Sequence, residues 1–147
     1  MIGELTESEV ENVLHGNVVG RIGCHADGKT YVVPVTYAYD GERVICHSAE
    51  GRKIAMMREN PEVCFEVEQI QDLANWRSVI AWGRFEELHG SDAASGMGLL
   101  VDRLLPLMKI AAGTSGHNIT PHGQQPGENT VVYSIRFAEK TGRFERR

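Results

Sequence analysis

Apolar and polar residues alternate along much of the chain, and short turn signals divide this alternation into runs of strand length. Such runs lie at residues 18–26, 30–40 and 42–49, and again at 62–70 and 77–89. Asp-Gly pairs separate the first three runs, and such pairs favour tight hairpin turns. The pattern therefore predicts an antiparallel β-sheet built from neighbouring hairpins.

Three segments show helical spacing instead. Residues 6–16 begin with a Thr-x-x-Glu capping box and end at a glycine. A second helix is expected from about residue 51 up to Pro61, which should end it. A third is expected over 91–110, where apolar residues recur on one helical stripe, with Pro106 kinking or ending it.

The last segments complete a mainly β fold. Residues 130–147 have the pattern of a final strand followed by a basic end. The stretch 111–129 is rich in Gly, Pro and polar residues, and it is longer than the roughly 12–15 residues usual for a structureless loop. A lid, a partner-binding arm or a disordered segment would each explain it. About six strands with helices at their ends predict an antiparallel β-barrel with α-helices, formed by one domain over residues 1–147.

Charge and cysteine content narrow the class of protein. A net charge of −5 and a pI near 5.7 argue against a nucleic-acid partner. No apolar run reaches the roughly 18 residues of a membrane span, and the first residues lack the pattern of a secretory leader, so we expect a cytoplasmic protein without a membrane partner. The 3 cysteines have no close pair, which favours small buried strand residues over a disulfide framework or a CxxC site.

The stretch 45–60 carries cations where a helix usually begins with acids. Arg52 and Lys53 lie in the first turn of the second predicted helix, at the positive end of its macrodipole. Ser48 could cap that helix, and free backbone N–H groups there would bind an anion. One hypothesis is a phosphate clamp made by Ser48, Gly51, Arg52 and Lys53. The other is an ordinary surface helix with solvated cations, and the residues alone leave both open.

Two further motifs could contact a planar ring. Trp76 could cover such a ring while Arg77 and Ser78 address its polar edges. Trp82, in mid-strand, is expected in the core or in an interface. Pro34 removes a ladder donor from its strand, which indicates an edge position, a bulge, or backbone opened toward a ligand.

Histidines supply the remaining candidates for chemistry. His47 ends a strand just before the possible clamp, where it could act as an acid, a base or an axial ligand, or be purely structural. His117 and His122 have no companion ligands in their loop, so we expect no metal site there.

Taken in order, these motifs resemble a known family. The matching stretches are "GRIGCHADGKTYVVPVTYAYDGERVICHSAEGRKIAMMRENPEVCFEVE", "WRSVIAWGRFEEL" and the terminal "TGRFE". They are similar to the pyridoxamine 5′-phosphate oxidase-like flavin-binding split-barrel proteins, most closely to the nitroimidazole-resistance branch. The resemblance implies an antiparallel split barrel of about six strands that forms a homodimer, with FMN held at the subunit interface.

The resemblance also implies roles for single residues. Backbone of the strand 33–35 would meet the isoalloxazine ring, Arg52 and Lys53 would hold the phosphate, and His47 is the candidate catalytic residue, for proton delivery. The full set of cofactor contacts that it implies is Val33, Pro34, Val35, His47, Ser48, Gly51, Arg52, Lys53, Trp76, Arg77 and Ser78. The C-terminal tryptophan and arginines with which the oxidases proper bind their substrate have no counterpart here, so pyridoxine phosphate is not the expected substrate.

The expected function is that of an FMN-dependent oxidoreductase acting on small molecules, with nitroaromatic or quinone-like compounds as acceptors. A non-catalytic flavin carrier or redox sensor would carry the same phosphate clamp. A third alternative is a haem- or deazaflavin-binding protein on the same barrel, with His47 or a loop histidine as the axial ligand of a haem.

Overall fold

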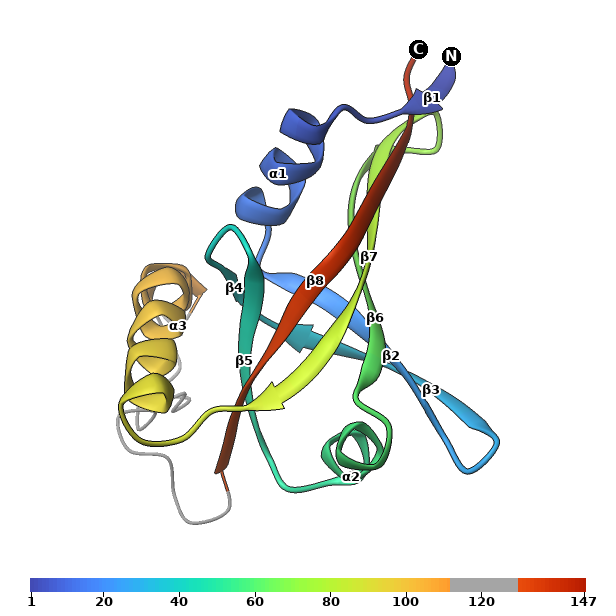
Figure 1. Ribbon diagram of the computed structural model, residues 1–147. Helices are drawn as coiled ribbons and strands as arrows, with labels where there is room; N and C mark the ends of the chain where they lie inside the picture. Colours follow the sequence, from blue (N-terminus) through green and yellow to red (C-terminus); the bar gives the residue numbers. More distant parts are fainter. Residues whose placement is uncertain (112–129) are drawn as a thin grey trace.

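The computed structural model describes residues 1–111 and 130–147 (Figure 1). Nearly all of the predicted 111–129 connection, with His117 and His122, lies outside the described residues. The elements in chain order are β1 (Ile2–Glu4), α1 (Glu7–Gly16), β2 (Val19–Ala26), β3 (Lys29–Thr36), β4 (Ala38–Tyr39), β5 (Arg43–Ala49), α2 (Arg52–Glu59), β6 (Glu62–Asp72), β7 (Asn75–Glu87), α3 (Gly90–Ala111) and β8 (Thr130–Glu145).

The described strands form one antiparallel sheet. Hydrogen bonds connect them in the order β3-β2-β6-β7-β8-β5-β4, and β1 pairs with β8. The predicted mainly β, antiparallel architecture is therefore confirmed. The 8 strands exceed the expected number because the short strands β1 and β4 join the six that the alternation predicts.

Three predicted boundaries differ from the structure. The run 30–40 is broken at Tyr37, whose backbone N–H donates to the Val18 carbonyl and whose hydroxyl donates to the Leu14 carbonyl at 2.8 Å. β7 begins at Asn75, because the Asp72 carboxylate closes a tight turn by accepting hydrogen bonds from the Ala74 backbone N–H and from the Asn75 side-chain amide. α3 continues past Pro106 to Ala111.

The core lies inside the curved sheet, and two helices contribute to it. α1 starts with the predicted capping box, in which Thr6 and Glu9 satisfy each other's backbone N–H groups, and it buries Val10, Val13 and Leu14. α2 buries its own apolar side, namely Ile54, Met56 and Met57. Cys24 and Cys46 are buried on strands and Cys64 is half-buried, all three as free thiols, as their spacing predicts.

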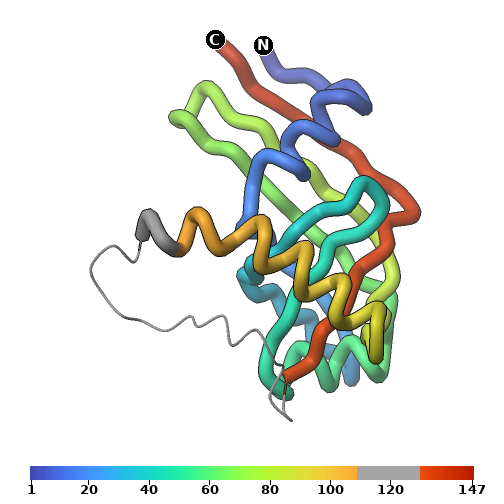
Figure 2. Tube along the Cα trace, turned by 90° about the vertical axis from the view of Figure 1, so that its left-hand side faces the viewer, coloured from blue at the N-terminus to red at the C-terminus, as the bar shows by residue number. Residues whose placement is uncertain are grey.

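The remaining elements set the ends of the molecule. The two termini and the β6–β7 hairpin lie at one end, and α2 lies at the other (Figure 1). α3 packs across β4 and β5 through a second cluster around Ile45, Met97 and Leu100 (Figure 2). Among the described helices, none combines the length and apolar character needed to cross a membrane.

Candidate functional site

The turn from β5 into α2 forms a helix N-terminus without a side-chain cap. Ser48, the predicted cap, does not fill that role, and its hydroxyl donates to the Ala49 carbonyl at 2.9 Å instead. The reason is strand pairing, because β5 stays in register with β8 through Ser48 and Ala49. The N-cap is Gly51, which has no side chain and an extended backbone with φ 178°.

The two N-termini of α1 and α2 differ in charge. α1 has acids in its first turn and the Thr6 cap, as the macrodipole favours. α2 has no acid in its first turn and begins with Arg52 and Lys53. The first turn of α2 therefore combines free backbone N–H groups, the partial positive charge of the helix end and two full positive charges.

Neighbouring elements hold the two cations beside the barrel. The Arg52 guanidinium lies 5.8 Å from the centre of the Tyr31 ring, and this contact connects α2 to β3. Lys53 is half-buried. Burial raises the pKa of the Cys24 and Cys46 thiols, and the positive charge of Lys53 acts in the opposite direction on both. The predicted clamp thus lies next to the strand that carries the predicted ring contacts.

Neither cation forms an ion pair with a residue of the described chain. The acid nearest in sequence, Glu50, is bound instead by Arg58, whose Nη1 and Nη2 donate to its two carboxylate oxygens at 2.7 and 2.9 Å. Those hydrogen bonds lower the pKa of Glu50. Arg52 and Lys53 consequently leave a region of uncompensated positive charge at a helix N-terminus, a donor set that fits a phosphate group.

β3 is an edge strand, which confirms one of the interpretations of Pro34. It pairs only with β2 among the described strands, at the end of the sheet path. Val33 and Val35 are half-buried against the core, while Pro34 is exposed opposite Arg21. His47 is exposed near the end of β5, in register with Val132.

The third predicted motif lies far from the clamp within one chain. Glu87, at the end of β7, contacts Arg58 of α2, whereas Trp76 lies eleven residues away at the start of that strand. At roughly 3.3 Å per residue this separation is about 36 Å along the strand. A single chain therefore does not bring Trp76, Arg77 and Ser78 to the start of α2.

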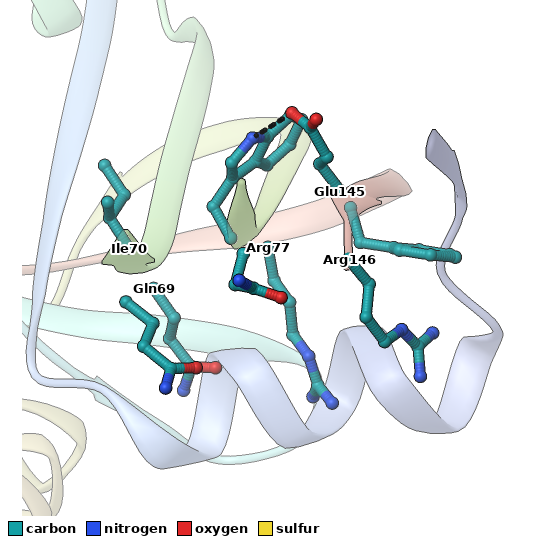
Figure 3. A pocket seen from close by; sticks show the side chains of 9 residues that line it. Gln69, Ile70, Arg77, Glu145 and Arg146 are labelled. Carbon is teal, nitrogen blue, oxygen red and sulfur yellow. Dashed lines mark hydrogen bonds between the residues drawn. The ribbon is translucent and has the colours of Figure 1, made fainter. Parts of the chain in front are cut away.

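The three residues of that motif also face different ways. The Trp76 indole N–H donates to Glu145 Oε1 at 3.1 Å. Arg77 and Arg146 extend toward α1 from a pocket of about 370 Å³ beneath the β6–β7 hairpin (Figure 3). Because side chains alternate along a strand, Ser78 lies with Trp76 on the opposite face from Arg77.

The outer face of the sheet carries exposed apolar side chains. Val32, Ile80 and Trp82 are 62%, 36% and 42% exposed, and Val32 and Trp82 line a hollow of about 730 Å³ together with Cys64. Arg21 crosses this face, with its Nη1 at 2.9 Å from Glu68 and 3.5 Å from Glu66. Burial, followed by the nearby Glu68, raises the pKa of Glu66 to about 7.

Several of these contacts join separate parts of the fold and were not predicted. Tyr31 under Arg52, the Arg58–Glu50 pair and the Arg21–Glu66–Glu68 group each depend on how separate elements meet. The one sequence signal was the alternation of β6, which places Glu66 and Glu68 on one face.

Comparisons with known proteins agree with this architecture. A family model described as pyridoxamine 5′-phosphate oxidase matches residues 6–144. An uncharacterized protein of Rhizobium meliloti strain 1021 is 36% identical over 84 residues, 57% of this chain and 56% of that protein, so the match spans just over half of the relative's length.

Solved structures show the same fold. A FAD-binding protein from Mesorhizobium loti is 28% identical, with a TM-score of 0.78 and 98% of both chains covered. A candidate 5-nitroimidazole antibiotic resistance protein from Bacteroides thetaiotaomicron is 16% identical, with a TM-score of 0.72, covering 98% of this chain and 87% of that one. These likenesses confirm the predicted split-barrel fold.

The raised pKa of Glu66 predicts a pH-dependent stability. The folded state holds the Glu66 proton up to about pH 7, whereas the unfolded chain releases it near pH 4.5. The contribution of Glu66 to the free energy of unfolding is therefore fully present below pH 4.5 and is lost as the pH rises to 7. Between pH 5 and 8 wild type should lose about 1–2 kcal/mol of unfolding free energy relative to Glu66→Gln. A full conversion of the pKa shift, at roughly 1.4 kcal/mol per pKa unit, would give a larger loss. The expected loss is smaller because the Glu66 side chain is 26% exposed and solvent screens its charge.

Urea unfolding of both proteins at several pH values measures this difference. Glu86→Gln, a change at an exposed carboxylate of β7, is the matched control and should follow wild type. Parallel stability curves for wild type and Glu66→Gln would contradict the assignment.

Proposed function

The chain belongs to the pyridoxamine 5′-phosphate oxidase family, and from that premise we propose that it binds a flavin whose phosphate lies at the start of α2. The observation that carries this proposal is the uncapped, acid-free N-terminus of α2, with Arg52 and Lys53 unpaired within the described chain. The FAD-binding protein of Mesorhizobium loti, which shares the fold, supports a flavin as the ligand.

FMN is the flavin that we propose. Its phosphate is a monoester with three free oxygens and up to two negative charges. Each phosphate of FAD instead has one ester bond and one anhydride bond, which leave it two free oxygens and a single charge. The Arg52 fork, the Lys53 ammonium and the leading N–H groups of α2 offer enough donors and charge for the monoester.

We assign the ring of the flavin to the edge of β3. Edge strands have backbone groups that no neighbouring strand uses, and these can bond the polar edge of a heteroaromatic ring. Val33 and Val35 hold that strand against the core, and Arg52 connects it to the phosphate site through Tyr31. His47 and Ser48 would line the segment between ring and phosphate.

We further propose that a second copy of the chain covers the outer face of the sheet. The exposed Val32, Ile80 and Trp82 form the kind of apolar patch that protein interfaces bury. In such a homodimer the Trp76–Ser78 segment of one chain could approach the flavin of the other, which the separation within one chain prevents.

The activity that we propose is oxidoreduction of small molecules, with nitroaromatic or quinone-like acceptors. A bound flavin would supply the electron transfer, and the chain would orient the ring and exclude water. His47 is the proposed proton donor because it is exposed and lies just before the phosphate site. A reduced nicotinamide is the proposed electron donor, in the cytoplasm, a compartment that fits the free thiols.

Removing both cations should abolish phosphate recognition. Arg52→Ala/Lys53→Ala should bind FMN at least about a hundredfold more weakly, because charge-assisted hydrogen bonds contribute roughly 1.5–3 kcal/mol each and the variant loses both donors. Riboflavin lacks the phosphate, so its affinity should change little. Fluorescence titration of both flavins measures this, with Arg43→Ala, at the other end of β5, as the control. Unchanged FMN affinity in the double variant would refute the phosphate site.

Introducing a charge on the outer face should separate the proposed dimer. Sedimentation should give wild type about twice the 16.3 kDa mass of one chain, and Trp82→Glu the mass of one. Leu107→Glu changes an equally exposed residue on α3 and should leave the dimer intact. A wild-type monomer at micromolar concentration, with FMN present, would argue against the interface.

Turnover distinguishes an enzyme from a flavin carrier or sensor. With NADPH and a quinone, the FMN-loaded protein should oxidise one NADPH per quinone reduced to the hydroquinone, much faster than the same concentration of free FMN. His47→Gln should slow this reaction and alter its pH profile while FMN stays bound. A rate no higher than that of free FMN would leave only the carrier or sensor.

A further inference from the structure

We propose that Arg58 is a positioning residue for the phosphate site, because it binds the Glu50 carboxylate and so keeps Arg52 and Lys53 available for the phosphate. This inference rests on the proposed function and extends it, since it assigns the preference for a phosphorylated flavin to a residue outside the clamp.

The sequence itself creates the problem that Arg58 solves. Glu50 lies two residues before Arg52, in the turn that leads into the clamp. A carboxylate at that position would be the natural partner of either cation, and it would repel an incoming phosphate. A phosphate site in this turn therefore needs Glu50 to be bound elsewhere.

The geometry shows how Glu50 is bound. Both of its oxygens are used, since Nη1 and Nη2 of Arg58 donate to Oε1 and Oε2 at 2.7 and 2.9 Å. This is the fork-to-fork arrangement that arginine forms with carboxylates, and it fixes the direction of the acid as well as its charge.

A second carboxylate anchors the guanidinium. The Arg58 Nε donates to Glu87 Oε1, and Glu87 lies at the end of β7, within the sheet. A lone ion pair as exposed as Arg58–Glu50 would contribute little to holding Glu50 in place. With Glu87 the pair becomes a three-residue network that joins the β5–α2 turn, the last turn of α2 and the sheet.

Loss of Arg58 should therefore weaken the binding of the flavin phosphate and leave the binding of the flavin ring unchanged. Glu50 would be free to pair with Arg52 or Lys53, and FMN would have to displace it. Riboflavin, which has no phosphate, would not compete with Glu50. Removing the charge of Glu50 as well should restore the site even though Arg58 is absent.

The experiment compares wild type, Arg58→Gln, Glu50→Gln and the double variant, each titrated with FMN and with riboflavin. Arg58→Gln should bind FMN about tenfold more weakly and riboflavin within about twofold of wild type. The double variant should return to within about threefold of wild type for FMN, and Glu50→Gln alone should not weaken FMN. Arg43→Gln, which breaks the 3.0 Å pair with Asp40 at the other end of β5, is the matched control and should change neither affinity.

Each contrary result has a distinct meaning. FMN affinity unchanged in Arg58→Gln would overturn the inference. A double variant as weak as Arg58→Gln would also overturn it, because Arg58 would then act through the position of α2 and not through Glu50. Wild type that binds FMN no better than riboflavin would show that the phosphate site itself is wrong, and the role of Arg58 would fall with it. A thermal melt of each variant verifies that the compared proteins are folded.

Discussion

The pairing of β5 with β8 determines where α2 begins, and the candidate site depends on that start. β5 stays extended in register with β8 as far as Ala49, so Ser48 cannot turn to cap the helix. The chain then enters α2 through Gly51, which offers no side chain to the leading N–H groups. Arg52 and Lys53 consequently follow directly at the open end of the helix, beside β3.

This arrangement costs stability that the core can supply. Two cations at a helix N-terminus oppose the macrodipole at roughly 0.3–1 kcal/mol each. α2 buries Ile54, Met56 and Met57, and burial of such a side chain contributes about 1.5–3 kcal/mol. Packing therefore outweighs the charge repulsion, and the helix forms with its positive end available. An anion bound there would remove the repulsion, which is the physical link between this fold and a phosphorylated ligand.

Local patterns in the sequence predicted what depends on neighbours along the chain. The six long strands and the capping box of α1 follow from alternation and spacing. The missing N–H of Pro34 left an edge position, a bulge or opened backbone as alternatives, and the structure shows the edge position. The Ser48 cap was wrong because strand pairing, a tertiary contact, outweighed a local preference for serine at a helix start. The Arg58 network joins residues of three elements, so no spacing in the sequence could indicate it. The role of the Trp76–Ser78 segment at the flavin stays a prediction, because within one chain this segment lies far from the start of α2.

The central claim is that a flavin phosphate binds at the start of α2, and backbone amide NMR tests it most directly. On addition of FMN, the amide resonances of Arg52, Lys53 and Ile54 should shift strongly, because those N–H groups would donate to the phosphate. Riboflavin should leave these three resonances nearly unchanged while it shifts those of β3. Shifts of equal size with both flavins, or shifts confined to another part of the sheet, would contradict the account.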